Sequence, residues 1–68
     1  MSEADKMFEE IGYEKIGDEF LLRGSDFKIS FSKLFRSVLI EGGDDAVLEI
    51  KELKAINQKC KELGWLDD

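Results

Sequence analysis

Histidine and proline are absent from this 68-residue chain, and cysteine occurs only once, at Cys60. Without histidine, no side chain has an ordinary pKa near neutrality, so the most common general base is missing. A single cysteine closes no disulfide within the chain and builds none of the usual zinc sites. No proline-rich or low-complexity linker is present either, so we expect a single domain over residues 1–68, held together by packing.

Long hydrophobic runs are also missing. The longest ones, such as Val38-Leu39-Ile40, are far too short to span a bilayer. The first six residues are polar and acidic, unlike a signal peptide. A lone thiol is typical of a reducing compartment. We therefore expect a soluble cytoplasmic protein, with enough hydrophobic residues (43%) to form a globular core.

Negative charge predominates, and it is unevenly distributed along the chain. The net charge is −6, with −5 over residues 1–20, +3 over residues 21–40 and −4 over residues 41–50. The electrostatic field of a net negative chain repels nucleic-acid phosphates. The negative charge either serves to bind a basic partner or simply keeps the protein soluble.

Two short segments share one pattern, the end of an amphipathic helix followed by a glycine and an aromatic residue. The pairs are Gly12-Tyr13 and Gly64-Trp65. Glycine just past a helix adopts positive φ without a Cβ penalty, and the next residue folds back over the last turn. We expect both glycines to have positive φ and both aromatic side chains to close the core.

The segments that precede these two glycines have the periodicity of amphipathic helices. A first helix is expected over residues 3–11, with Ser2 as its N-cap. A second is expected over about residues 50–63. The apolar stripe of the first helix consists of Ala4, Met7, Phe8 and Ile11, and that of the second of Ile50, Leu53, Ile56, Cys60 and Leu63.

The middle of the chain favours β-strands. Residues 27–32 alternate strictly, with Phe27, Ile29 and Phe31 on one face, which predicts an antiparallel sheet with one buried face. Further strands are expected over residues 13–16 and 20–23, and a short one over 46–48. The predicted fold is α+β: a helix, three or four antiparallel strands and a C-terminal helix, with both helices on one sheet face.

The run Leu34–Ile40 allows two strand registers. One buries Leu34, Val38 and Ile40, and the other buries Phe35 and Leu39. Since both faces are partly apolar, this strand is a candidate for cover on both sides. A partner or a second copy on the outer sheet face would provide that cover.

The chain resembles small uncharacterised proteins carried by phages and prophages of Gram-positive bacteria. The resemblance rests on Met7–Tyr13 near the start and on Glu52–Trp65 near the end, about a third of the chain. It implies a helix, an antiparallel sheet and a closing helix. It implies no known activity and brings no catalytic residues.

Acidic side chains are the candidate binding residues. The turn at residues 41–45 carries three acids and no base, on a connection expected to be exposed. A second patch is expected on the first helix. The candidates are Glu41, Asp44 and Asp45 in the turn, and Glu9 and Glu10 on the helix.

A basic group interleaved with phenylalanines is the alternative site. Its members are Arg23, Lys28, Lys33 and Arg36, with Phe27, Phe31 and Phe35 between them. Sheets that stack single-stranded bases have this composition. Strand alternation, however, places Phe27 and Phe31 in the core.

These observations favour a non-enzymatic interaction protein of phage origin that binds or inhibits a basic host or phage protein. No catalytic residue, metal or cofactor is expected. The alternative is a self-assembling structural module with no inhibitory role, and a third hypothesis is a weak nucleic-acid binder that uses the basic strands.

Overall fold

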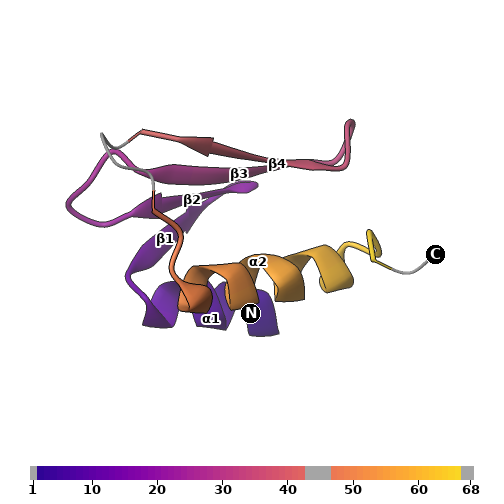
Figure 1. The fold of residues 1–68 in the computed structure, drawn as a ribbon, viewed down its shortest axis with the longest axis horizontal. Helices are drawn as coiled ribbons and strands as arrows, with labels where there is room; N and C mark the ends of the chain where they lie inside the picture. Colours follow the sequence, from indigo (N-terminus) through magenta and orange to yellow (C-terminus); the bar gives the residue numbers. More distant parts are fainter. Residues whose placement is uncertain (1, 43–46, 67–68) are drawn as a thin grey trace.

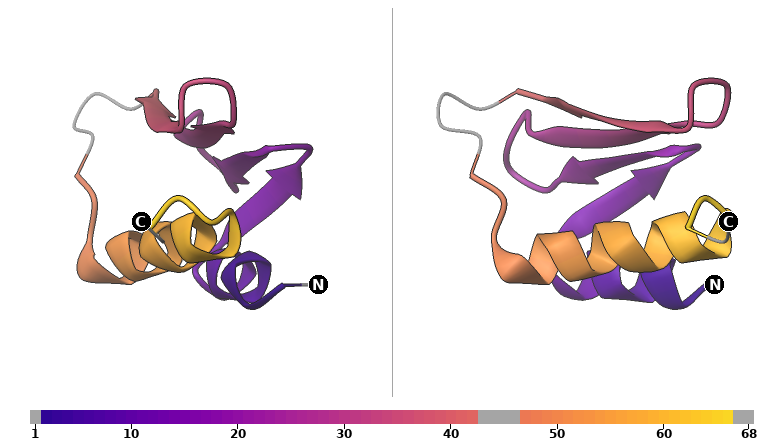
Figure 2. Two further views of the ribbon diagram at one scale, coloured as in Figure 1. Left: turned by 90° about the vertical axis from the view of Figure 1, so that its right-hand side faces the viewer. Right: turned by 45° about the vertical axis from the view of Figure 1, so that its right-hand side comes forward.

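A computed structural model describes residues 2–42 and 47–66 of the chain. In chain order, its elements are α1 (Glu3–Glu10), β1 (Tyr13–Ile16), β2 (Glu19–Leu22), β3 (Lys28–Ser32), β4 (Ser37–Glu41) and α2 (Ile50–Glu62) (Figure 1). The strands form one antiparallel sheet in the order β1-β2-β3-β4, so β1 and β4 are its edges. Both helices lie side by side on one face of this sheet (Figure 2). The predicted α+β fold is confirmed, with four strands.

Aromatic side chains form the centre of the core. The Phe8 ring from α1 stacks on the Phe20 ring at 4.1 Å between centroids. It meets the rings of Tyr13 and Phe31 edge-on, at 5.5 and 6.1 Å. Offset and edge-on contacts of this kind add to the stabilisation from buried area. The inward direction predicted for Phe27, Ile29 and Phe31 is confirmed, because all three are buried.

The helix ends follow the sequence prediction closely. Ser2 Oγ accepts a hydrogen bond from the Asp5 N–H at 3.1 Å, as expected of an N-cap. Gly12 and Gly64 have φ of +98° and +77°, so the predicted positive φ is confirmed at both. The helices stop one residue earlier than predicted, because Ile11 and Leu63 are their C-caps.

The prediction of a strand from Leu34 onward was wrong, because β4 begins only at Ser37. The chain must reverse after β3, and residues 33–36 form that turn, with Arg36 at a φ of +51°. Leu34 and Phe35 are consequently 83% and 76% exposed at its tip.

Within β4, the register that buries Val38 and Ile40 is the observed one, but Leu34, which it also buried, lies in the turn. Val38 and Ile40 point inward and are half-buried, whereas Leu39 points outward and is 54% exposed. Nothing in the described chain covers the outer face of this strand. The short strand expected at residues 46–48 was also wrong where it can be judged: Val47 and Leu48 belong to no strand, and Ala46 lies outside the described residues.

The predicted apolar stripe of α2 was wrong in its N-terminal half. Ile50 and Leu53 are 66% and 45% exposed, while Glu52 and Ala55 are buried in their place. Ala55 is small enough for α1 to pack closely, and the Tyr13 hydroxyl holds the Glu52 carboxylate inside at 2.6 Å. The stripe holds in its C-terminal half, where the half-buried side chains are Ile56, Cys60 and Leu63.

Candidate functional site

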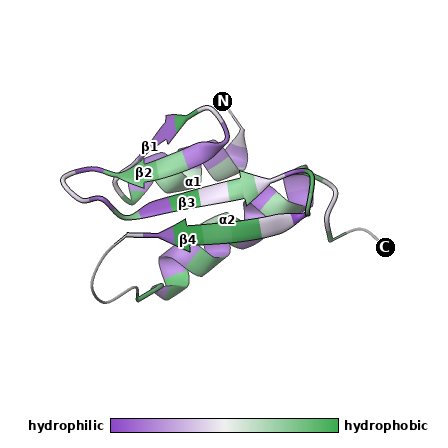
Figure 3. Cartoon of the chain, turned by 90° about the horizontal axis from the view of Figure 1, so that it is seen from above, coloured by the Kyte–Doolittle hydropathy of each residue, from purple (hydrophilic) through white to green (hydrophobic). Residues whose placement is uncertain are grey.

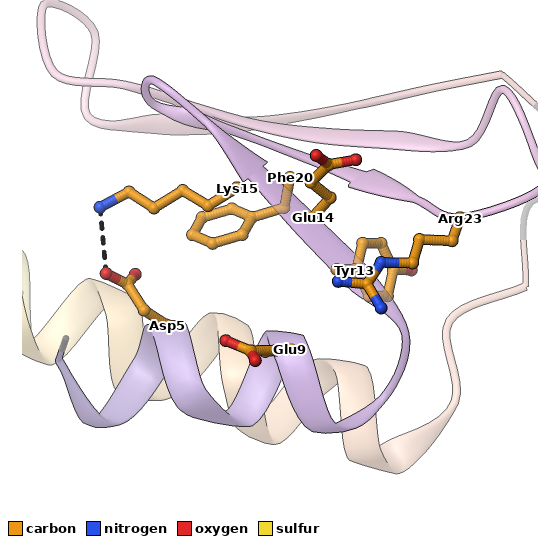
Figure 4. A pocket seen from close by; sticks show the side chains of 7 residues that line it. All are labelled: Asp5, Glu9, Tyr13, Glu14, Lys15, Phe20 and Arg23. Carbon is orange, nitrogen blue, oxygen red and sulfur yellow. Dashed lines mark hydrogen bonds and ion pairs between the residues drawn. The ribbon is translucent and has the colours of Figure 1, made fainter.

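A pocket of about 410 Å³ opens between α1 and the β1 edge of the sheet (Figure 4). Asp5 and Glu9 reach it from α1, where a spacing of four residues places them on one helix face. Strand β1 contributes three consecutive residues, and the segment from β2 onward contributes two. The lining residues are Asp5, Glu9, Tyr13, Glu14, Lys15, Phe20 and Arg23.

One wall of the pocket is a partly buried ion-pair cluster around Asp5, whose side chain is 11% exposed. Lys15 Nζ lies 3.0 Å from Asp5 Oδ2, and Lys59 Nζ lies 3.5 Å from Asp5 Oδ1. Burial acts to raise the pKa of Asp5, but the hydrogen bond from Lys15 and the charges of both lysines outweigh it and lower that pKa. Lys59 also lies 5.8 Å above the centre of the Phe20 ring. Asp5 is therefore an ionised, already neutralised group that links α1, β1 and α2.

The remaining acids near the pocket are not neutralised. Glu9, Glu10 and Glu14 are exposed and form no ion pair with any residue in the described ranges. Glu9 and Glu14 line the pocket, and Glu10 follows Glu9 at the end of α1. These three residues, which we call the acidic surface, present carboxylates that are unpaired in the described chain on both sides of the β1 edge, because Glu14 points away from α1 and Glu9 (Figure 4).

Tyr13, which lines the pocket, forms a buried hydrogen bond with Glu52 that the sequence analysis did not predict. Tyr13 is 2% exposed, and its hydroxyl donates a 2.6 Å hydrogen bond to Glu52 Oε2. The other oxygen, Glu52 Oε1, accepts from the Glu49 N–H at 2.9 Å. Burial and the negative charge of Glu52 raise the pKa of Tyr13 well above its usual range. Because both groups are buried and satisfied, we assign this pair to stability and not to binding.

The five predicted acidic residues do not form one site. Glu41 ends β4, at the sheet edge opposite β1, and its carboxylate lies 3.6 Å from Lys28 Nζ. Asp44 and Asp45 lie outside the described residues. Only Glu9 and Glu10 adjoin the pocket, where the structure adds Glu14, a residue that the sequence analysis did not select. The sequence offered little reason to select Glu14, because a single glutamate on the exposed face of a strand is common and does not by itself indicate a binding site.

The predicted basic patch is dispersed over the molecule. Arg23 lines the pocket, whereas Lys33 and Arg36 lie in the turn at the other end of β3. Lys28, on the outer sheet face, pairs with Glu19 at 3.2 Å as well as with Glu41. The hydrogen bond and charge of Glu19, with the charge of Glu41, raise the pKa of Lys28.

Two of the remaining basic residues are also engaged, and the phenylalanines are not available to bases. Lys33 pairs with Asp18 at 3.7 Å, and the Arg36 guanidinium donates to the Trp65 carbonyl oxygen at 2.9 Å. Phe27 and Phe31 are buried, so neither can stack a base. Phe35 alone is exposed.

Reactive groups are few in the described part of the chain. Cys60 is half-buried, and burial raises the pKa of its thiol, which disfavours the nucleophilic thiolate. Among residues 2–42 and 47–66, no group of three histidine, cysteine or acidic side chains is placed to hold a metal ion. Of the two helices that the structure describes, neither could span a bilayer.

Comparison with known protein families, with curated proteins and with solved structures found no match. The resemblance to small phage proteins therefore stays a prediction. The arguments about function rest on the geometry of this chain.

Proposed function

We propose that this chain is a non-enzymatic interaction protein that binds a basic surface of another protein through the acidic surface at Glu9, Glu10 and Glu14. The observation that carries the proposal is the unpaired state of these three exposed carboxylates within the described chain. Complementary charge speeds encounter between proteins and selects partners.

The distribution of ion pairs supports this location. Acids elsewhere on the sheet have cationic neighbours, as Glu19 and Glu41 have Lys28 and as Asp18 has Lys33. The uncompensated negative charge is thereby concentrated along α1 and β1. The adjoining pocket, of about 410 Å³, offers room for a side chain of a partner.

The wider setting of this function follows from the resemblance to phage proteins. We place the protein in the cytoplasm of a bacterial host, as a phage-derived protein that binds, and in doing so inhibits, a basic host or phage protein. A nucleic-acid site on such a target has the required positive charge. Direct binding of nucleic acid by this chain is disfavoured by its net charge of −6 and by the dispersed basic residues.

A pull-down with paired variants tests the proposal. Immobilised wild-type protein is exposed to lysate of a Gram-positive bacterium, beside the double variant Glu9→Lys/Glu10→Lys and the control Asp18→Lys. The control reverses a charge at an exposed position of the turn between β1 and β2. We expect a basic protein to be retained by the wild type and the control but lost from the double variant, and to be released at about 0.5 M salt by screening.

Circular dichroism of each variant must first show an intact fold. Equal retention on all three proteins would contradict the assignment to the acidic surface. Recovery of RNA or DNA in place of a protein would contradict the proposed class of partner.

A further inference from the structure

The edge strand β4 leaves defined backbone groups unpaired in the described chain. The Phe31 N–H donates to the Asp18 carbonyl at 3.2 Å and the Phe27 carbonyl accepts from Leu22, so alternate residues of β3, including Phe31, face β2. Ser30 must then face β4, where it is the partner of Leu39. The N–H and C=O groups of Val38 and Ile40 consequently point to the free edge.

The side chains of β4 do nothing to discourage pairing at this edge. Its centre is Val38-Leu39-Ile40, which presents half-buried side chains on the inner face and the 54% exposed Leu39 on the outer face. Natural edge strands are usually protected by lysine, proline, a bulge or inward-pointing charge. The opposite edge, β1, carries Glu14 and Lys15 at its centre. The two edges therefore differ, and only β4 is suited to receive another strand.

Helix α2 extends the apolar surface below this edge. Its N-terminal turns emerge from under the sheet beyond the free side of β4 (Figure 3). Those turns carry Ile50 and Leu53, the two stripe residues that remain 66% and 45% exposed. An amphipathic helix that leaves part of its apolar stripe uncovered lacks a neighbour on that side.

We propose that this chain forms a two-fold symmetric dimer in which β4 pairs antiparallel with β4 of a second copy, with Leu39 on the axis. In this register Val38 of each copy lies opposite Ile40 of the other. Both pairs exchange two hydrogen bonds, which satisfies all the free edge groups of Val38 and Ile40. The emerging turn of each α2 then lies beneath the β4 strand of the other copy, where Ile50 and Leu53 are covered.

A second copy fits this edge better than an unrelated chain because the strand is self-complementary. Its three apolar residues are symmetric about Leu39. In this register Glu41 of each copy lies opposite Ser37 of the other, so no like charges are opposed along the paired strands. An isologous interface requires this match of one surface with itself.

The first test compares two matched substitutions by analytical ultracentrifugation. Leu39→Lys places two lysines opposite each other on the axis, and Ile16→Lys makes the same change at a similarly exposed position (52%) on the outer face of β1. We expect concentration-dependent dimerisation of the wild type, a dissociation constant raised at least about tenfold in Leu39→Lys, and no change in Ile16→Lys. Wild type that stays at 7.8 kDa at about 1 mM, or equal effects of both variants, would overturn the proposal.

A second test reads the register directly and does not depend on the folding of Leu39→Lys. Opposed residues that do not exchange hydrogen bonds have Cα atoms about 4.5 Å apart, within the range of a disulfide. With oxidised glutathione as the electron acceptor, Leu39→Cys should therefore form a disulfide-linked dimer rapidly, while Ile16→Cys, with the same Cys60 background, should not. Slow crosslinking of Leu39→Cys at the rate of Ile16→Cys would reject the Leu39 axis.

Dimerisation should persist in Glu9→Lys/Glu10→Lys, because the acidic surface lies at the other edge.

Discussion

At the scale of single residues, the most consequential feature is the buried carboxylate of Glu52. A charged group loses its hydration on burial and is tolerated only when hydrogen bonds replace the water. Here one oxygen accepts from the Tyr13 hydroxyl and the other from the Glu49 N–H. The pair joins β1 to the first turn of α2, two segments that are far apart in the sequence.

Removal of the Tyr13 hydroxyl should therefore be costly. Tyr13→Phe leaves Glu52 Oε2 buried without its donor, and we expect a loss of about 2 kcal/mol in the free energy of unfolding, measured by urea denaturation. Glu52→Gln is the matched control, because its amide oxygen still accepts one of the two hydrogen bonds, so it should cost less. A loss below about 0.5 kcal/mol in Tyr13→Phe would show that water replaces the hydroxyl.

The same pair predicts a dependence on alkaline pH. The folded-state pKa of Tyr13 is raised, so its hydroxyl contributes full stability below the unfolded value of about 10 and loses that contribution as pH rises toward the folded value. The stability difference between wild type and Tyr13→Phe should accordingly be constant from pH 7 to 9 and shrink above about pH 10. A difference that grows with pH would contradict the assigned direction.

At the scale of elements, the end of α2 shows how one glycine directs a helix terminus. The Trp65 N–H donates to the Cys60 carbonyl at 2.9 Å and the Gly64 N–H to the Lys61 carbonyl at 3.0 Å, which is the Schellman arrangement. This turn returns the half-buried Trp65 ring to the core, 6.3 Å from the Phe31 ring. Its carbonyl in turn receives the Arg36 guanidinium at the β3–β4 turn.

Substitution of Gly64 isolates the conformational part of this ending. A Cβ at Gly64 would meet no atom within 4 Å, so the cost of Gly64→Ala arises only from its φ of +77°. We expect about 1 kcal/mol of destabilisation in thermal or urea unfolding. Gly64→Asn should cost less, because asparagine tolerates this conformation. Equal costs for the two variants would point to a rearranged helix end.

At the scale of the whole molecule, ion pairs and hydrogen bonds tie the two helices to each other and to the sheet. Asp5 joins α1 to Lys15 of β1 and to Lys59 of α2, while Glu62 of α2 accepts from the Ala4 N–H at 2.9 Å. Desolvation acts to raise the pKa of Glu62, but the hydrogen bonds from the Ala4 N–H and from the Gln58 side chain outweigh it and lower that pKa. The acidic surface lies at the β1 edge and the proposed dimer contact at the β4 edge, so two partners can be engaged at once.

Loss of the Asp5 charge should weaken this assembly in a pH-dependent manner. The folded-state pKa of Asp5 is depressed, so its contribution is present above the unfolded value of about 4 and is lost as pH falls. We expect Asp5→Asn to lose about 1 kcal/mol at pH 7, with the difference from wild type vanishing toward about pH 2. Asp18→Asn is the control, since Asp18 and Lys33 are each about two-thirds exposed and 3.7 Å apart, and it should change stability little. Equal effects of the two substitutions would contradict the special role of Asp5.

Properties that depend on neighbours in the chain were predictable from the sequence. The N-cap at Ser2, the positive φ of Gly12 and Gly64, and the inward face of β3 all follow from local sterics and side-chain periodicity. Together with the apolar stripe of α1 and the C-terminal half of the stripe of α2, they were sufficient for the α+β architecture and for the placement of both helices on one sheet face (Figure 2).

Only the tertiary structure decided which side of α2 is buried, which acids are neutralised and where the pocket lies. The burial of Glu52 and the exposure of Ile50 and Leu53 depend on a hydroxyl that arrives from β1 and on the close approach of α1 at Ala55. The sequence likewise identified Glu9, Glu10 and Glu41 as candidate binding residues. It could not show that Lys28, on the neighbouring strand, neutralises Glu41. The reason is that long-range contacts depend on how whole elements are placed relative to one another. The residue pattern within a single element carries no information about that placement.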